Sequence, residues 1–141
     1  MIREYEQSKP EIELLKIGEK ESFEFNLPSV EFNELFYEIR FKDFSSKDYR
    51  VLFLWKEKKP IAYIALDLKR GNGYANITSI FVLKKYRKKG YATKLIRKSL
   101  SAKSIEKITL QVYSHNEASL KLYNKLGFNV ISYNMEYKND S

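Results

Sequence analysis

Cysteine is absent from the 141 residues, and the chain contains a single histidine, His115. Without cysteine there can be no disulfide bond, no thiolate metal site and no cysteine nucleophile. Zinc and similar ions usually take several His or Cys ligands, so we expect no metal centre.

Long apolar runs are also absent, since no stretch approaches the roughly 20 residues that a membrane-spanning helix needs. The first residues lack the apolar core of a secretory signal. A glycine-rich phosphate loop followed by Lys-Ser or Lys-Thr is missing as well. We therefore expect a cytoplasmic protein that has no membrane partner.

Acidic residues are scarce in the second half of the chain. The net charge is +8, yet residues 1–67 carry 14 acidic and 11 basic residues, whereas residues 68–141 carry 4 acidic and 15 basic ones. Residues 69–103 contain 11 basic residues and no acidic one. A lysine-rich solvated surface accounts for part of this excess, but its crowding into one segment predicts a polyanionic ligand.

The length and the 43% hydrophobic content suit one domain spanning residues 1–141. Hydrophobic periodicity predicts an α+β (mixed α/β) fold around a largely antiparallel sheet, in the order strand, helix, three strands, helix, strand, helix, strand. The predicted strands are 11–18, 49–56, 60–69, 74–83, 105–113 and 129–137, and the first two predicted helices are 30–39 and 91–103. Residues 40–48 fit a loop or a second short helix.

Local signals refine three of these boundaries. Ser29 is the expected N-cap of the first helix, and Gly71-Asn72-Gly73 predicts a hairpin, because both central positions of such a turn tolerate positive φ. The last helix is expected to open with a capping box from Ser114 to Glu117 and to end at Gly127 in a left-handed conformation.

The segment that joins strand 74–83 to helix 91–103 should bind an anion. A helix N-terminus presents free backbone N–H groups and a partial positive charge. Gly90 and the small Ala92 would let a phosphate approach the backbone closely. Arg87 and the neighbouring lysines add positive charge.

Asn116 and Tyr123 lie seven residues apart and would therefore share one face of the last helix, roughly 10 Å apart along its axis. A tyrosine side chain on a helix points back toward the N-terminus. The two side chains could flank one extended ligand, although a tyrosine in an apolar stripe is also typical of a core.

Two segments resemble the GCN5-related N-acetyltransferase (GNAT) superfamily. Arg87, Gly90 and Ala92 match the Q/R-x-x-G-x-G/A core of its motif A. The family's motif B, an Asn followed by A-x-x-L-Y-x-x-x-G-F, is matched at family spacing by Asn116, Ala118, Tyr123, Gly127 and Phe128.

The resemblance implies an enzyme that transfers an acyl group, most simply acetyl from acetyl-CoA, to a primary amine by direct attack in a ternary complex. It implies a GNAT-like sheet splayed between its fourth and fifth strands. Tyr123 would be the general acid, Asn116 would contact the CoA arm, and the backbone of Phe81 and Val82 would bind pantetheine. The pyrophosphate would lie on the backbone of Arg87, Lys88, Lys89, Gly90, Tyr91, Ala92 and Thr93.

The general base and the acceptor stay open. One subfamily has a glutamate base where this chain has Gln111, which cannot take a proton. Glu34, Glu38, Asp67 and His115 are the candidates that remain, and each also fits a solvated surface residue. The acceptor could be a small molecule or a protein amine, and a homodimer is compatible with the sequence.

Two other readings compete with the enzyme. One is a catalytically degenerate GNAT fold that binds acyl-CoA, which Gln111 favours and Tyr123 opposes. The other is a nucleic-acid-binding domain, suggested by the basic residues of 84–103 with Tyr86 and Tyr91 between them. The paired motifs favour the enzyme, so we do not expect nucleic acid as the partner.

Overall fold

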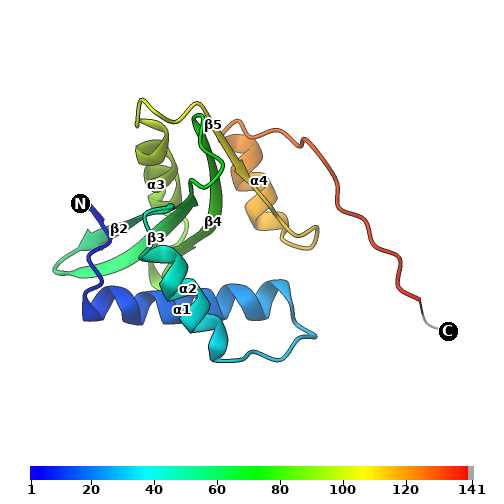
Figure 1. Cartoon of the computed structure of the whole chain (residues 1–141), viewed down its shortest axis with the longest axis horizontal. Coiled ribbons are helices and arrows are strands. Elements are labelled where there is room, and N and C mark those ends of the chain that lie inside the picture. Colours follow the sequence, from blue (N-terminus) through cyan, green and yellow to red (C-terminus); the bar gives the residue numbers. More distant parts are fainter. Residues whose placement is uncertain (140–141) are drawn as a thin grey trace. The chain divides into compact units, whose positions relative to one another are not determined.

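The computed structural model describes residues 1–139. It divides into two compact units, Met1–Gln111 and the residues from Val112 onward. The first unit contains a five-stranded sheet with helices on both faces (Figure 1). The second contains one helix and an extended segment.

The sheet of the first unit follows the chain in the order β1-β2-β3-β4-β5. The first four strands pair antiparallel, and β5 pairs with β4 in parallel. The strands are β1 (Ile2–Glu4), β2 (Tyr49–Lys56), β3 (Lys59–Asp67), β4 (Tyr74–Val82) and β5 (Lys107–Leu110). The predicted largely antiparallel sheet flanked by helices is therefore confirmed.

The antiparallel meander β2-β3-β4 forms as the sequence predicts. At the β3–β4 turn Asn72 and Gly73 take φ values of 55° and 80°, the positive values expected for this turn. Strand β3 is buried from Pro60 to Leu66. Both faces of such a strand must be covered by other elements.

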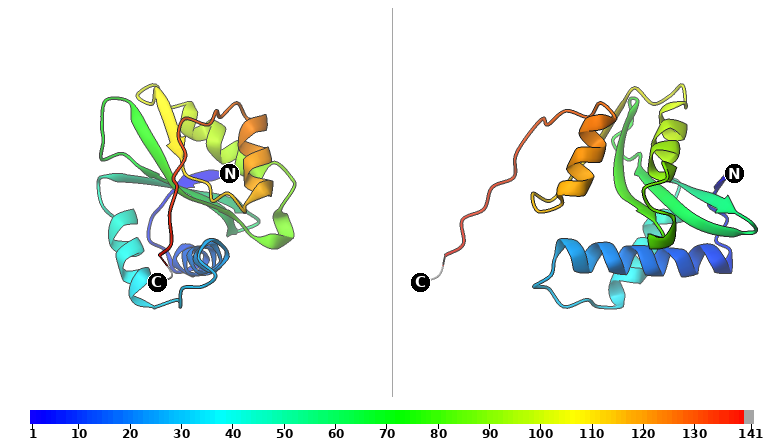
Figure 2. Two further views of the ribbon diagram at one scale, coloured as in Figure 1. Left: turned by 90° about the vertical axis from the view of Figure 1, so that its right-hand side faces the viewer. Right: turned by 180° about the vertical axis from the view of Figure 1, so that it is seen from behind.

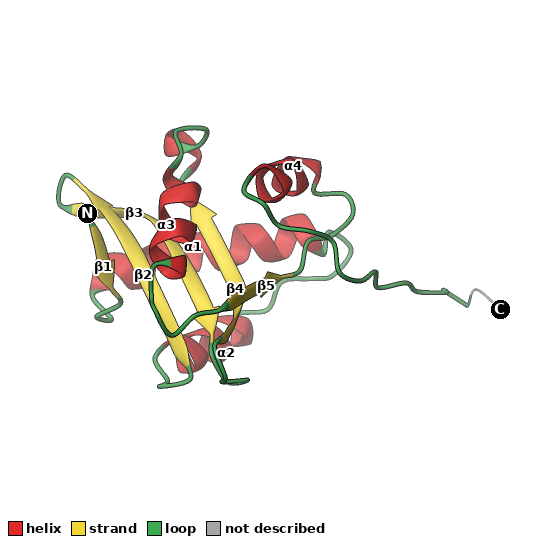
Figure 3. Cartoon of the chain, turned by 90° about the horizontal axis from the view of Figure 1, so that it is seen from above, coloured by secondary structure: helices red, strands yellow, loops and turns green. Residues whose placement is uncertain are grey.

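Helices supply that cover on the two faces (Figures 2 and 3). Helix α1 (Lys9–Asn26) and helix α2 (Leu35–Phe44) lie on one face, and α3 (Tyr91–Leu100) lies on the other. The core under α1 and α2 contains Leu14, Leu15, Phe44, Val51, Phe53, Tyr63, Ala65 and Phe81. On the other face, α3 buries Leu95 and Ile96.

The predicted strand at residues 11–18 is wrong, because these residues lie within α1. The helix begins after Ser8, and the Glu11 carboxylate accepts hydrogen bonds from the Ser8 backbone N–H at 3.0 Å and the Ser8 hydroxyl at 2.7 Å. Pro10 in the first turn favours a helix further, since its fixed φ suits that position. This start signal outweighs the short alternation of apolar residues that follows it.

The predicted helix at residues 30–39 begins later than expected. Helix α2 starts at Leu35 with Glu34, not Ser29, as its N-cap, and it extends to Phe44. Phe32 lies before the start of α2 and is nevertheless packed: its ring contacts Phe23 and Phe36 at centroid distances of 5.5 and 6.0 Å. Residues 40–48, which fit either a loop or a helix by sequence, are thus helical in their first half.

In the second unit, helix α4 spans Glu117–Lys125. The predicted capping box is wrong, because Asn116 is the N-cap and its side-chain oxygen accepts from the Ser119 N–H at 3.3 Å. The predicted end is confirmed: Gly127 has φ 101°, and the Phe128 N–H donates to the Tyr123 carbonyl at 2.9 Å. With the bond from the Gly127 N–H to the Asn124 carbonyl at 3.1 Å, this bond forms a Schellman motif.

The predicted strand at residues 129–137 is also wrong. Within the described residues 129–139 no strand forms, and the side chains of Val130, Ile131, Tyr133, Met135 and Tyr137 are 57–92% exposed. Alternating apolar residues favour an extended chain, but a strand also needs a neighbouring backbone to pair with. The sequence pattern alone cannot supply that neighbour.

Candidate functional site

The segment between β4 and α3 turns sharply. A short 3-10 helix, η1 (Lys84–Tyr86), follows β4, and Arg87 returns to extended backbone. Lys88 and Gly90 then take positive φ values of 62° and 85°, and Gly90 is the N-cap of α3.

The first backbone N–H groups of α3 find no hydrogen-bond partner within residues 1–139. Among the hydrogen bonds of the described residues, none is donated by the amides of Gly90, Tyr91, Ala92 or Thr93. No side chain caps the helix start either. This helix N-terminus therefore offers several free donors to an anion, as the sequence predicts.

Gly90 leaves the approach to these donors open. A Cβ built on Gly90 would meet no atom within 4 Å, so the space in front of the residue is empty of protein. Its φ of 85° would strain any L-residue with a side chain. Glycine is thus favoured by the backbone conformation and keeps the surface accessible.

The second half of β4 has a free edge. Strand β5 pairs only with Tyr74–Ile77, whereas β4 continues to Val82. Thr78 is an extra residue in the pairing of β4 with β3, because Ala65 pairs with Ser79 and Leu66 with Ile77. The sheet thus parts between β4 and β5 next to a β-bulge.

The register of β4 shows which backbone groups face that edge. The Leu83 N–H bonds to the Ile61 carbonyl at 2.9 Å, and the groups that face the partner strand alternate along an antiparallel ladder. By this alternation Phe81 bonds toward β3, while Ile80 and Val82 direct their N–H and C=O groups to the free edge. The Val82 carbonyl indeed accepts from a group outside the ladder, Arg87 Nε, at 2.8 Å.

Arg87 braces the turn. Besides its bond to Val82, its guanidinium pairs with the Glu21 carboxylate of α1 at 2.5 Å and lies over the Phe81 ring at 5.5 Å. The guanidinium is thus engaged by groups of the protein itself.

Lysines surround two tyrosines beside the turn. The rings of Tyr86 and Tyr91 meet edge to face at 6.4 Å, and Lys56 of β2 donates to the Tyr91 hydroxyl at 3.3 Å. The Tyr86 ring lies 5.6–5.9 Å from the ammonium nitrogens of Lys56, Lys59, Lys85 and Lys89. Lysines of the β2–β3 hairpin thus lie beside the basic residues that follow position 69 in the sequence.

Asn116 and Tyr123 belong to the second unit. Asn116 uses its side-chain oxygen to cap α4, which leaves its Nδ2 group as the available donor. Tyr123 is 8% exposed, and its ring packs edge to face on Phe128 at 5.6 Å. Burial raises the pKa of Tyr123 to about 12, so the phenol is a proton donor at neutral pH and not a base.

The four base candidates differ in their surroundings. Glu34, Glu38 and His115 are exposed, and Gln111 is exposed as well. Asp67 is engaged at the β3–β4 turn, where it accepts from the Lys69 N–H at 2.9 Å and the Tyr49 hydroxyl at 3.4 Å.

Asp67 is also far from the free edge. It pairs with Asn76, four residues before Ile80, which corresponds to roughly 13 Å along β4. A proton could not pass directly over that distance.

A buried carboxylate that the sequence analysis missed lies against strands β3 and β4. Glu19 of α1 is 2% exposed and bonds to Arg40, Tyr63 and Ser79 from three other elements. The available signal was the Ser8–Glu11 capping box, because a helix starting there places Glu19 on the same buried face as Leu15.

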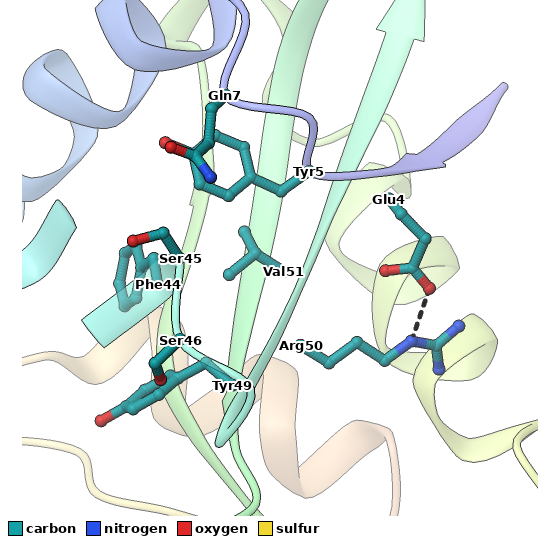
Figure 4. A pocket seen from close by; sticks show the side chains of 9 residues that line it. All are labelled: Glu4, Tyr5, Gln7, Phe44, Ser45, Ser46, Tyr49, Arg50 and Val51. Carbon is teal, nitrogen blue, oxygen red and sulfur yellow. Dashed lines mark hydrogen bonds and ion pairs between the residues drawn. The ribbon is translucent and has the colours of Figure 1, made fainter. Parts of the chain in front are cut away.

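The first unit also contains a pocket of about 180 Å³ that none of the predicted site residues lines (Figure 4). It lies beside β1 and β2, where Arg50 and Glu4 form an ion pair at 2.8 Å. The side chains of Tyr5 and Tyr49 contribute to its wall. We assign it no role in the chemistry of the turn.

None of the helices within residues 1–139 is long and apolar enough to cross a lipid bilayer. The same range contains no group of three or more His, Cys, Asp and Glu side chains arranged to hold a metal ion.

Comparison with known proteins gives a consistent family and fold. The family model described as the acetyltransferase (GNAT) family matches residues 14–128, whereas a search of curated proteins finds no match. The fold of a tetramutant of the BH1408 protein from Bacillus halodurans is similar, with a TM-score of 0.81, 21% identity and 99% of each chain covered.

Two aminoglycoside acetyltransferases share the fold as well. The 6'-N-acetyltransferase from Acinetobacter haemolyticus gives a TM-score of 0.72 at 19% identity over 100% of this chain and 99% of that one. An aminoglycoside N-acetyltransferase solved in complex with CoA gives 0.72 at 16% identity over 100% and 95%. At these identities the likeness concerns the fold alone.

Proposed function

The chain belongs to the GNAT acetyltransferase family, and on that premise we propose that it transfers the acetyl group of acetyl-CoA to a primary amine of a small molecule or a protein. The observation that carries the proposal is the row of unbonded amides at Gly90–Thr93, in the turn and helix start that follow a strand whose edge is free. We further propose that residues 1–141 act as a single N-acetyltransferase domain.

The pyrophosphate of CoA is proposed to bind at the start of α3. Free N–H groups, a partial positive charge and an unobstructed glycine suit a diphosphate without any side-chain ligand. Arg87 supports this site by bracing the turn. The Arg87 amide is itself engaged, since it donates to the Lys84 carbonyl at 3.3 Å. The residues proposed to bind the coenzyme are Ile80, Val82, Lys88, Lys89, Gly90, Tyr91, Ala92, Thr93 and Asn116.

The pantetheine arm is proposed to bind the free edge of β4 as an added strand would. Val82 and Ile80 have backbone groups that face this edge. Ile80 takes the place that the sequence analysis gave to Phe81, because the backbone of Phe81 is used within the sheet. The Phe81 side chain instead supports the core.

The lysines around Tyr86 and Tyr91 suit the remaining phosphate of CoA. Lys56 and Lys59 come from the β2–β3 hairpin and add charge that the turn itself does not supply. An aromatic ring beside ammonium groups also offers a stacking surface for a nucleobase. Both features favour the 3'-phosphorylated nucleotide end of the coenzyme.

The reaction proposed is a direct transfer. The uncharged amine nitrogen attacks the thioester carbonyl and the new C–N bond forms. The C–S bond then breaks, the nitrogen loses a proton to give the amide, and one proton neutralises the departing thiolate to give free CoA. An N–H of the free β4 edge stabilises the negative charge on the carbonyl oxygen. Tyr123 donates a hydrogen bond to the departing sulfur, a role that its raised pKa suits because the phenol stays protonated.

Calorimetry with acetyl-CoA and a free-thiol assay with a panel of amines test the proposal. Tyr123→Phe should lower the rate of thiol release by about 10- to 100-fold, since one catalytic hydrogen bond is lost, while the affinity for acetyl-CoA holds. Tyr133→Phe is the control, because Tyr133 is 83% exposed in the same unit.

Three outcomes are separable. If the protein binds no acetyl-CoA, the proposal is refuted. If it binds acetyl-CoA but none of the amines in the panel leads to thiol release, the protein is a catalytically degenerate acyl-CoA-binding module. If it binds nucleic acid with steep salt dependence that acetyl-CoA leaves unchanged, the basic surface serves that other function.

A further inference from the structure

Four elements of the first unit meet around one buried carboxylate. Glu19 Oε2 accepts a hydrogen bond from the Tyr63 hydroxyl at 2.5 Å. Glu19 Oε1 accepts from the Ser79 hydroxyl at 3.0 Å and lies 3.0 Å from Arg40 Nε. A carboxylate thus lies between two helices and two strands, with a partner on each of the other three elements.

The packing around Glu19 is tight. A Cβ added at the preceding residue, Gly18, would collide with the Tyr63 hydroxyl and would lie 2.8 Å from a Phe81 ring carbon. Helix α1 therefore approaches the sheet at a distance that only glycine permits. This approach places the Glu19 carboxylate within hydrogen-bonding reach of β3 and β4.

Stability alone does not account for this arrangement. Taking a carboxylate out of water costs several kcal/mol, and apolar residues of similar volume usually stabilise a core as well or better. A buried ionisable group with a shifted pKa is more typical of a site that performs chemistry.

Ser79 connects Glu19 to the free edge of β4. It is half-buried, and it precedes Ile80, whose backbone faces that edge. Tyr63 is fully buried and Arg40 cannot give up its proton, so neither can pass a proton between solvent and Glu19. Only Ser79, among the three partners, has both a transferable proton and access to solvent.

We infer that Ser79 and Glu19 form the proton relay that activates the acceptor amine, an inference that rests on the proposed function. The amine nitrogen gives its proton to Ser79 Oγ while the Ser79 hydroxyl proton passes to Glu19 Oε1. The uncharged amine then attacks the thioester. The proton returns to solvent when the product leaves, so the relay is restored.

The electrostatics around Glu19 suit a base. Burial raises the pKa of Glu19, against the opposing effects of the Tyr63, Ser79 and Arg40 hydrogen bonds and the Arg40 charge. A carboxylate with a raised pKa takes a proton more readily than an exposed one. The pKa of Tyr63 is raised well above its usual value by burial and by Glu19, with a smaller contribution from Glu21, so Tyr63 remains a donor that fixes the carboxylate.

Two acceptor probes separate the relay from the rest of catalysis. Ethylamine is a lysine-type amine of which only about 0.04% is uncharged at pH 7, given a pKa near 10.4. Hydroxylamine is weakly basic and uncharged at that pH, so it needs no base for activation. Saturating concentrations of each, with acetyl-CoA and the full chain, give kcat by thiol release.

Ser79→Ala should lower kcat for ethylamine by about 100-fold or more, the usual contribution of a general base. It should leave kcat for hydroxylamine and the affinity for acetyl-CoA within about twofold. Ser79→Thr keeps a hydroxyl and should restore most of the ethylamine activity. Glu19→Gln should abolish the rise of kcat/KM with pH that the wild-type protein shows with ethylamine.

Other results overturn the inference. Equal losses with both probes, or a lower melting temperature with unchanged kcat, would mean that Ser79 and Glu19 serve stability only. A wild-type protein that acetylates hydroxylamine but not ethylamine has no amine-activating base. Failure to bind acetyl-CoA is a different result, because it refutes the proposed function itself and the relay falls with it.

Discussion

Gly90→Ala separates the backbone strain of the turn from its role in binding. The substitution adds a methyl group where no protein atom lies within 4 Å, so it creates no clash. It does place alanine at φ 85°, which costs about 1–2 kcal/mol relative to glycine. A chain of this length should then melt about 3–8 °C lower.

The effect on coenzyme binding should be larger than the effect on folding. The methyl group would project into the space in front of the free amides and separate them from a phosphate. The loss of one charge-assisted hydrogen bond, at about 1.5–3 kcal/mol, weakens binding by about 10- to 150-fold. Isothermal titration calorimetry with CoA measures this change, and differential scanning fluorimetry measures the melting temperature.

Gly71→Ala is the matched control. Gly71 has φ 68°, and a Cβ there would also meet nothing within 4 Å. It lies at the β3–β4 turn, roughly 30 Å from the start of α3 along β4. Both variants should lose similar stability, and only Gly90→Ala should lose affinity. Equal CoA affinities in the two variants would show that the turn does not bind the pyrophosphate.

Two further predictions concern charge. Lys56→Gln should weaken CoA binding about fivefold at low salt and less at 0.5 M salt, because screening removes the contribution of an exposed ammonium group. Lys58→Gln in the same hairpin is the control and should change the affinity little. Calorimetry at the two salt concentrations compares the two variants. The folded pKa of Tyr123, about 12, exceeds the unfolded value near 10, so the stability that its buried neutral phenol contributes is complete below pH 10 and is lost as the pH rises toward 12. The loss should amount to about 2.7 kcal/mol in urea unfolding and should be missing from Tyr123→Phe, so parallel pH profiles of the two proteins would contradict it.

The parts of the fold that sequence analysis predicted well depend on local signals. Strand β2 begins and ends at the predicted residues, because a β-branched and aromatic run is bounded by turns. The β3–β4 hairpin follows from the positive φ that Asn72 and Gly73 accept. The left-handed Gly127 follows in the same way from its place after an apolar helix.

The two errors have different causes: a local capping interaction decides the first, and a missing partner strand decides the second. The alternation around Leu14 fits a strand as well as a helix over a few residues, and the capping interaction at Ser8 selects the helix. Residues 129–137 have the pattern of a strand, but pairing requires a neighbour that the pattern does not specify.

One part of the candidate site could be predicted from the sequence, and another part could not. The free amides at Gly90 could be predicted because they result from a turn of a few residues. The partners of Glu19 could not, because its bonds to Tyr63 and Ser79 span 44 and 60 residues of chain. A carboxylate becomes a buried relay only after the sheet and α1 have packed.

The unpaired end of β4 also affects how the protein behaves in concentrated solution. A row of backbone groups without partners is the place where a second polypeptide can add a strand and start aggregation. Thr78 bulges the strand at the start of this stretch, and the charged Lys84 and Lys85 follow its end. Both features discourage such pairing, and any bound molecule that occupies the edge would protect the protein during purification and storage.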